Sequence, residues 1–338
     1  MTLLEVKDLA VQFSTAEGTV RAVRGVDFTV EAGRTLGIVG ESGSGKSVTS
    51  LAVMGLHRGA EVTGSVRFDG TELIGAPEET VRALRGRRMA MVFQDALTSL
   101  HPYFTIGDQI SEAYQAHFGG KRRTAWARAV EVLGDVGIPE PARRAGEYPH
   151  QFSGGMRQRA MIALALSCEP DLIIADEPTT ALDVTVQAQV LELLMKLQQD
   201  RGLGIIMITH DLGVIARVAD EVLVMYGGSA AEQAPAETLF TAPRHPYTRG
   251  LLDSLPRLDA ADGDALVSIP GSPPSLLAPP AGCPFHPRCA VYEAASEEGR
   301  RACTDERPPL RLVAEHHRTA CLLDSPSDGR GPQKEATA

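Results

Sequence analysis

The sequence predicts an α/β fold in which a mainly parallel sheet carries a phosphate-binding loop. Three observations support this class. A glycine-rich loop at residues 40–47 lies between an apolar strand and a helix, which is the context in which the pattern G-x-x-x-x-G-K-[ST] binds phosphate. Further apolar strands end in polar residues, as is typical of sheets that bind ligands at their carboxyl edge. Helical stretches separate these strands, as parallel connections require.

The glycine-rich loop is the most specific of these features. It reads Gly40-Glu41-Ser42-Gly43-Ser44-Gly45-Lys46-Ser47. Glycines let backbone N–H groups approach phosphate oxygens, and the helix N-terminus adds partial positive charge. We expect Lys46 to contact the β- and γ-phosphates of a nucleotide and Ser47 to bind Mg²⁺. The loop therefore predicts a site for ATP or GTP.

Length and composition limit the number of domains, the kinds of partner and the location that we expect for the chain. A chain of 338 residues is long enough for two domains, or for one large domain with an appendix. The formal net charge of −10 argues against general binding to nucleic acid, which needs a basic surface. The start of the chain lacks a signal-peptide layout, and no apolar run approaches the ~18 residues of a membrane span. We therefore expect a cytosolic protein with no transmembrane segment and no nucleic-acid partner.

The first third of the chain predicts antiparallel strands around the loop. Residues 4–13 alternate as a strand does, with a slip near residues 7–8, and residues 20–23 and 28–30 predict two more short strands. Residues 65–68 predict a strand that ends in a hairpin at Asp69-Gly70. Phe13 is either a core aromatic, the commoner role, or the surface on which an adenine stacks.

The middle of the chain predicts a buried strand followed by a helical insert. Residues 89–93 form the strand, and Gln94 follows at its end, where ligands bind in α/β sheets. Residues 107–145 then have a helical pattern. Ser153-Gly154-Gly155 opens the next helix. Its free amides make it either a second anion site or an ordinary N-cap, and the residues alone favour the N-cap.

Two more buried strands end in candidate catalytic residues. Asp176-Glu177 follows the strand at 172–175. Adjacent carboxylates are costly there unless a metal or a water uses them, so Asp176 fits Mg²⁺ and Glu177 fits the base that aligns a water. Asp183 precedes the next helix, and His210 ends the strand at 204–209. Because His210 is the third polar group in such a position, we expect it to contact the γ-phosphate.

Taken together, these motifs resemble the ATP-binding cassette (ABC) ATPases over residues 1 to about 235. The resemblance implies a P-loop NTPase fold with a RecA-like core sheet, an antiparallel β subdomain and a helical subdomain at about 95–168. It implies a head-to-tail dimer in which Ser153, Gly154 and Gly155 of one subunit cap the γ-phosphate bound by the other. It further implies that Phe13 stacks on adenine. It also implies that Gln94 is both a ligand of Mg²⁺ and a catalytic residue. Asp183 would be one of the residues that bind the nucleotide.

A narrower resemblance concerns four segments of the chain. These are residues 94–102, 154–159, 245–248 and 282–289, which look like the D-type ATPases of oligopeptide/dipeptide (peptide/nickel) importers. That resemblance implies ATP hydrolysis coupled to peptide import at the cytoplasmic face of the membrane. Its partners would be an F-type second ATPase, two integral membrane permeases and an extracytoplasmic peptide-binding protein. Nickel or glutathione import is the alternative, and a soluble ABC ATPase of DNA repair or translation fits less well.

The last part of the chain predicts an irregular extension, so we divide the chain into residues 1–255 and 256–338, with a mobile polar tail from 325. Four cysteines gather in the extension, with spacings of six, fourteen and eighteen positions: Cys283, Cys289, Cys303 and Cys321. The spacing matches neither a zinc ribbon nor a ferredoxin run. Four thiolates can hold Zn²⁺ or a [4Fe–4S] cluster. Resemblance to the importer subfamily favours the cluster, with zinc or free thiols as alternatives.

Overall fold

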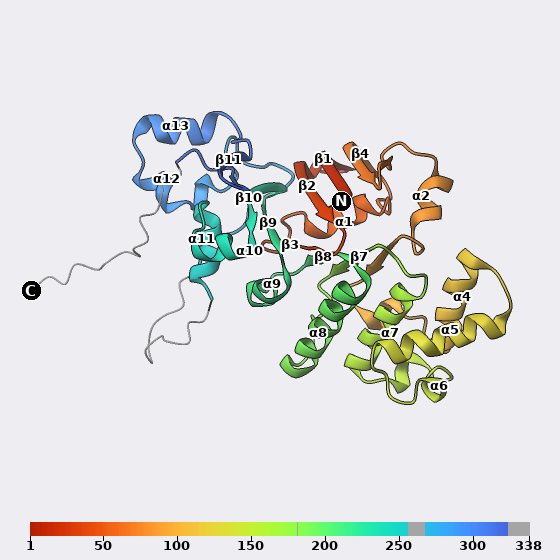
Figure 1. Ribbon diagram of the computed structural model, residues 1–338. Helices are drawn as coiled ribbons and strands as arrows, with labels where there is room; N and C mark the ends of the chain where they lie inside the picture. The colour runs from red at the N-terminus through yellow and green to blue at the C-terminus, as the bar shows by residue number, and fades with distance from the viewer. Residues whose placement is uncertain (181, 256–267, 324–338) are drawn as a thin grey trace, which may run out of the picture.

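Two sheets form the framework of the computed structural model, which describes residues 1–180, 182–255 and 268–323 (Figure 1). The polar tail predicted from residue 325 lies outside the described residues, and so do the first residues after the proposed boundary at 255. Within the described ranges, none of the helices is both long enough and apolar enough to cross a membrane.

The larger sheet has eight strands among the described residues. Their order is β11 (Arg311–Ala314), β12 (His317–Thr319), β10 (Ser229–Pro235), β9 (Glu221–Tyr226), β3 (Thr35–Val39), β8 (Gly204–Ile208), β7 (Leu172–Asp176) and β6 (Met89–Val92). The strands from β9 to β6 run parallel, and β10 to β11 continue the sheet antiparallel. Every residue of β3, β7 and β8 is buried, which explains their continuous apolar sequences. The predicted parallel core sheet is confirmed.

The smaller sheet is antiparallel and lies at the N-terminal end of the chain. Its order is β2 (Gly18–Glu31), β1 (Thr2–Thr15), β4 (Ala60–Phe68) and β5 (Thr71–Glu72). The predicted slip is confirmed as register shifts around residues 7–8 in both pairings of β1, and Asp8 has a φ of 46° there. The predicted hairpin is also confirmed, with Asp69 and Gly70 at φ values of 47° and 76°.

One prediction in this region is wrong. Residues 20–23 and 28–30 belong to the single strand β2 rather than to two strands. The residues between them break the apolar alternation, but they keep pairing with β1 through register shifts at Leu9 and Ala10. A bulge of this kind preserves the ladder while it changes which side chains face the core.

Helices surround the sheets and form most of the insert between β6 and β7. Their bounds are α1 (Lys46–Val53), α2 (Glu78–Leu84), α3 (Ala96–Ser99), α4 (Ile106–Phe118), α5 (Arg122–Asp135), α6 (Pro141–Arg144), η1 (Pro149–Gln151), α7 (Gly154–Leu166), α8 (Val184–Arg201), α9 (Leu212–Val218), α10 (Ala236–Thr241) and α11 (Pro246–Asp253). Helices α3 to α7 form one group at the β6 end of the sheet, at the right of Figure 1.

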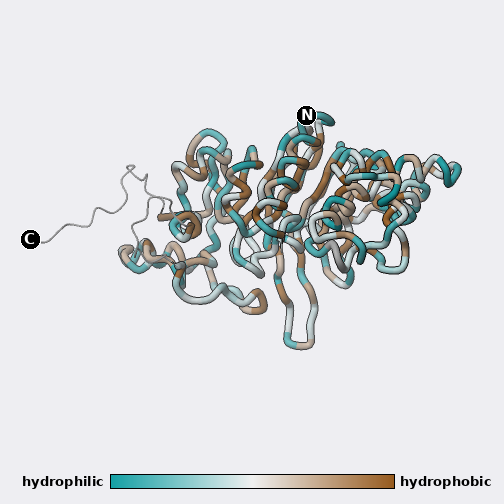
Figure 2. The backbone as a smooth tube through the Cα atoms, turned by 90° about the horizontal axis from the view of Figure 1, so that it is seen from below, coloured by the Kyte–Doolittle hydropathy of each residue, from teal (hydrophilic) through white to brown (hydrophobic). Residues whose placement is uncertain are grey.

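The C-terminal extension packs at the opposite end of the molecule. It contains η2 (His286–Arg288), α12 (Ala290–Ala294) and α13 (Glu297–Asp305). Strand β12 pairs with β10 at Glu232 and Gln233, so the extension continues the central sheet. Figures 1 and 2, which differ by a 90° rotation, both place it away from the helical insert.

Candidate active site

The phosphate loop joins β3 to α1 and fits closely against β9. A Cβ atom added at Gly40 would lie 2.2 Å from the carbonyl oxygen of Met225, and one added at Gly45 would lie 2.5 Å from that of Ala22. Both glycines also have positive φ, 152° and 102°. Larger side chains are therefore excluded, and the backbone N–H groups remain free to approach a bound anion.

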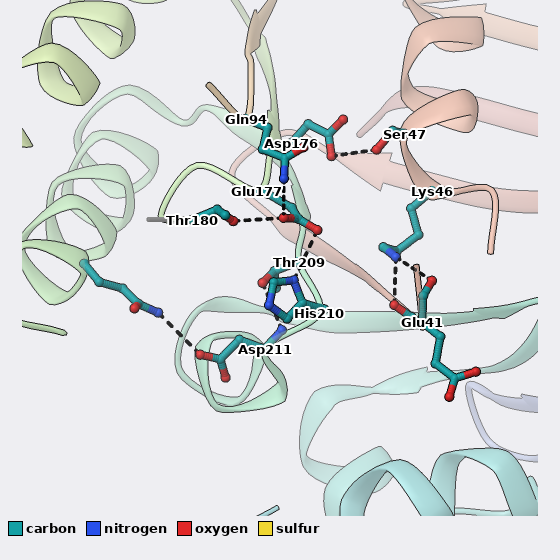
Figure 3. A network of polar contacts seen from close by, with 12 residues as sticks. Glu41, Lys46, Ser47, Gln94, Asp176, Glu177, Thr180, Thr209, His210 and Asp211 are labelled. Carbon is teal, nitrogen blue, oxygen red and sulfur yellow. Dashed lines mark hydrogen bonds and ion pairs between the residues drawn. The ribbon is translucent and has the colours of Figure 1, made fainter. Parts of the chain in front are cut away.

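Lys46 opens helix α1 and points back over this loop. Its Nζ atom donates hydrogen bonds to the carbonyls of Gly40, at 2.7 Å, and Glu41, at 3.0 Å (Figure 3). Burial lowers the pKa of Lys46, and the nearby carboxylates Glu177 and Asp176 oppose that effect. The hydroxyl of Ser44 is buried and has no hydrogen-bond partner among the described residues. A lysine, an unpaired hydroxyl and a glycine cradle fit a polyphosphate.

Ser47 and Asp176 meet beside the loop. The Ser47 hydroxyl donates to Oδ1 of Asp176 at 3.1 Å. Burial raises the pKa of Asp176, although the bond from Ser47 and the charge of Lys46 act against it. Hydroxyl and carboxylate oxygens are the ligands that Mg²⁺ prefers, so these two residues fit the predicted metal. When bound, Mg²⁺ would neutralise charge on the phosphates.

The Glu177 carboxylate contacts three other side chains of the site. One carboxylate oxygen accepts hydrogen bonds from Gln94 Nε2 and Thr180 Oγ1, each at 2.9 Å, and the other lies 3.2 Å from His210 Nδ1 (Figure 3). Its backbone N–H donates to the Ile208 carbonyl of the neighbouring strand β8. Burial alone would raise the pKa of Glu177, but the bonds from His210 and Thr180 leave it lowered. Glu177 is therefore an oriented carboxylate.

Glu177 also has an unusual backbone conformation. Its φ is 48°, which is uncommon for a residue with a side chain and worth attention at a functional site. This turn follows directly after β7, so Asp176 is directed towards Ser47 and Glu177 towards His210. The two adjacent carboxylates therefore face different partners.

Sequence reasoning missed one member of this cluster, Thr180. A hydroxyl three residues after an acidic residue is the signal that could have identified it, because such a spacing allows a local side-chain bond within a turn. Gln94 also differs in detail from its predicted role, since its amide nitrogen bonds to Glu177. Its amide oxygen is the atom that could serve a metal.

The predicted signature lies outside this cluster. Ser153 is the N-cap of α7 and accepts a hydrogen bond from the Met156 N–H at 3.3 Å. A Cβ atom at Gly155 would lie 2.5 Å from Val186 Cγ1, so the signature packs against the start of α8. Asp183 is the N-cap of α8. The structure thus places the signature against Leu182 and Val186, the residues on either side of the first turn that Asp183 caps, and Ser153 and Gly154 are exposed.

Phe13 lies near the end of β1, opposite Val20 and Ala60. Its ring packs partly against the core beneath the small sheet and is otherwise exposed. Phe13 therefore contributes to the core, as the first expectation has it, and its stacking on adenine stays a prediction.

The structure corrects the prediction for the cysteines of the extension. Cys283, Cys289, Cys303 and Cys321 are buried around one small cavity. Across the described residues, however, no group of three or more His, Cys, Asp or Glu side chains is arranged to hold a metal ion. Burial raises the pKa of Cys283 to about 11 and that of Cys321 to about 12, which favours thiols over the thiolates that a metal binds. The iron–sulfur prediction is therefore wrong, and zinc has no support.

Two family profiles match the chain. The profile described as "ABC transporter" matches residues 23–180, and the one described as "Oligopeptide/dipeptide transporter, C-terminal region" matches residues 231–295. The first therefore includes the phosphate loop, the signature and both carboxylates, and the second begins in β10 and ends shortly after α12.

Relatives and solved structures agree with these matches. The chain is 54% identical to the oligopeptide transport ATP-binding protein OppD of Haemophilus influenzae, covering 85% of this chain and 89% of that protein. It is 52% identical to OppD of Salmonella typhimurium, covering 95% and 93%. The dimeric structure of the bacterial ABC transporter cassette MJ0796 superimposes with a TM-score of 0.62 and 28% identity, covering 69% of this chain and 98% of that one. A dimer of the same cassette bound to ADP and Pi has the same TM-score with 26% identity. The chain belongs to the ABC transporter family, among its oligopeptide transport ATP-binding proteins.

Proposed function

We propose that this chain hydrolyses ATP to drive the import of short peptides through a membrane ABC transporter. The observation that carries the proposal is the arrangement around Glu177, whose carboxylate is oriented by Gln94, Thr180 and His210 beside the phosphate loop. The resemblance to OppD proteins supports peptides as the cargo. A nickel or glutathione importer of the same family is the alternative.

Each site residue has its own role in ATP hydrolysis. Lys46 and the amides of the phosphate loop bind the β- and γ-phosphates. Glu177 aligns a water and accepts its proton as the water oxygen bonds to the γ-phosphorus, while the bond to the bridging oxygen breaks and ADP leaves. His210 lies on the open side of Glu177, where it contacts the γ-phosphate. Ser47 and Asp176 would hold Mg²⁺, which would offset the negative charge of the phosphates.

A second ATPase subunit completes the site in this proposal. Ser153 and Gly154 are exposed and lie at the start of α7, so their free amides are available to an ATP on another subunit. The dimeric cassettes among the solved structures support a dimer, and the head-to-tail arrangement of its two subunits is part of this proposal. The partner that we propose is an F-type paralogue of this chain.

The membrane partners lie on the side of the helical insert. Tyr103 and Phe104, which follow Gln94, are 83% and 51% exposed, and neighbouring exposed aromatics are a feature of docking surfaces. We propose that this segment contacts two integral membrane permeases and transmits ATP-driven closure to them. An extracytoplasmic binding protein would deliver the peptide, and the chain itself would lie at the cytoplasmic face of the membrane.

Reconstitution of the purified complex in liposomes tests the proposal. With the binding protein present, a tripeptide should stimulate ATP hydrolysis and accumulate in the vesicle lumen, and Glu177→Gln should abolish both. Stimulation by a nickel chelate or glutathione instead of the peptide would identify the alternative. An ATPase that never associates with permeases would refute transport altogether.

A further inference from the structure

The second residue of the phosphate loop, Glu41, is bound by the C-terminal extension. Its carboxylate accepts two parallel hydrogen bonds from the guanidinium of Arg288, at 2.7 Å and 3.1 Å. The Arg288 side chain is only 6% exposed. A bidentate pair of this kind fixes both the distance and the orientation of the two groups, so Arg288 determines where the Glu41 side chain lies.

Arg288 is itself held from two directions. Within the extension, its Nε and Nη2 atoms donate to the carbonyls of Pro270, at 2.7 Å, and Ile269, at 3.3 Å. From the central sheet, the hydroxyl of Tyr226 in β9 accepts a bond from Nη1 at 3.1 Å. Five acceptor atoms from four residues therefore surround one guanidinium, and Arg288 is a rigid support for Glu41.

The backbone of Glu41 is fixed as well. Its N–H donates to the hydroxyl of Tyr247 at 2.9 Å, and its carbonyl accepts a bond from Lys46 Nζ at 3.0 Å. Tyr247 is fully buried against Tyr226 and Phe285, with ring centroids 4.5 Å and 5.3 Å away. A chain of contacts thus runs from the extension through Glu41 to the lysine that faces the phosphates.

We propose that Arg288 is a positioning residue for ATP binding, which acts by holding Glu41 so that the phosphate loop and Lys46 keep the geometry that binds phosphate. Without Arg288, the partly buried carboxylate of Glu41 would lose its counter-ion and move towards water. That movement would displace a carbonyl that orients Lys46. The C-terminal extension is then part of the nucleotide site, whichever substrate the transporter carries.

The competing possibility is that the ion pair between Arg288 and Glu41 only attaches the C-terminal extension to the rest of the chain and has no effect on ATP binding. A second buried pair does so elsewhere: His317 Nε2 in β12 lies 2.7 Å from Glu232 Oε1 in β10, and both side chains are buried. His317→Gln therefore provides a matched control, because it weakens an attachment of the extension without touching the phosphate loop.

The test compares Arg288→Met with His317→Gln in the full purified chain. We measure the Kd for ATP in the presence of Mg²⁺ by isothermal titration calorimetry, and the melting temperature by circular dichroism. Arg288→Met should raise the Kd about tenfold. In the complex assembled with the second ATPase subunit and the permeases, it should raise KM for ATP with little change in kcat, since Arg288 contacts neither Glu177 nor His210. His317→Gln should lower the melting temperature but leave the Kd within about twofold. An unchanged Kd in Arg288→Met, or equal losses of affinity in both variants, would overturn the proposal.

If Arg288→Met does not fold, a second measurement tests whether the extension is coupled to the nucleotide site. Coupling between two sites is reciprocal, so ATP bound to the unaltered chain should slow hydrogen exchange of the backbone amides of His286, Arg288 and Cys289. The amides of β11 and β12 serve as the internal control and should change less. Equal protection of both segments, or none, would show that the extension is not coupled to the nucleotide through Arg288.

Discussion

His210 Nδ1 lies 3.2 Å from Oε1 of Glu177, on the side of the carboxylate opposite the bonds from Gln94 and Thr180. The two residues come from the ends of adjacent parallel strands, β8 and β7. Glu177 is mostly shielded, whereas the His210 side chain is 64% exposed. The imidazole is therefore far more exposed than the carboxylate that it contacts, and it is placed to meet a ligand that arrives from solvent.

Replacing Glu177 by Gln should abolish turnover and preserve ATP binding. The amide keeps the shape of the side chain but cannot accept a proton from water, a loss that costs about 10²–10⁴-fold in rate. Steady-state phosphate release gives kcat, and calorimetric titration gives the Kd. Hydrolysis at the full rate in this variant would show that Glu177 is not the base.

Replacing His210 by Ala should lower kcat about 100-fold with little change in stability. Because the imidazole is largely exposed, its removal should change the free energy of unfolding by no more than about 0.5 kcal/mol. His316→Asn is the control, since His316 is an exposed histidine remote from the site with a φ of 53°, which Asn tolerates. A comparable fall in kcat in that control would count against a specific role.

Gly40→Ala and Gly59→Ala separate crowding from backbone strain. Both glycines have positive φ, but a Cβ atom at Gly40 would lie 2.2 Å from a carbonyl oxygen, and one at Gly59 would meet nothing within 4 Å. Gly59→Ala should cost about 1 kcal/mol of stability and leave ATP binding unchanged. Gly40→Ala should abolish ATP binding, because the loop must move away from β9. Equal ATP affinities in the two variants would contradict this account of the loop.

Stability should decrease as the pH falls from about 6.5 to about 4 because of His245. Burial lowers the pKa of this imidazole to about 4 in the folded protein, while its Nδ1 atom accepts the Tyr247 N–H. Below about pH 6.5 the unfolded chain binds a proton that the folded chain does not, so folding becomes less favourable by roughly 3 kcal/mol over this range.

His245→Asn keeps an N-cap acceptor for α11 and removes the titrating group. The free energy of unfolding, measured by urea denaturation between pH 7 and pH 5, should depend less on pH in this variant than in the unaltered chain. If the two curves have the same slope, His245 does not titrate as described.

Local patterns were sufficient to predict most of the core and the site. The phosphate loop and the strand ends carry their chemistry within a few residues, so the positions of Lys46, Asp176 and Glu177 followed from the sequence. Strand β2 was misjudged because residues 24–27 break its alternation, and only the partner strand shows that pairing continues. The cysteine prediction failed because spacing describes which thiols exist, but not whether burial leaves them in an arrangement that holds a metal.

Contacts between distant segments were beyond sequence reasoning. Glu41 and Arg288 are 247 positions apart, and neither belongs to a pattern that names the other. Their pairing depends on the extension returning to the sheet beside β10 and placing Arg288 against Tyr226 of β9, which no local propensity specifies. Thr180 is a different case, because its bond to Glu177 is local and a side-chain turn could have been considered.

The pairing of β12 with β10 determines whether a shortened form of the protein can be purified without aggregating. A fragment that stopped at residue 255 would leave β10 as a bare outer strand, with unpaired backbone groups ready to template strands from other molecules. It would also remove the imidazole of His317 from the buried carboxylate of Glu232, which would lose that hydrogen-bond partner. Such a fragment should aggregate during purification, so assays of ATP binding and hydrolysis need the full-length chain.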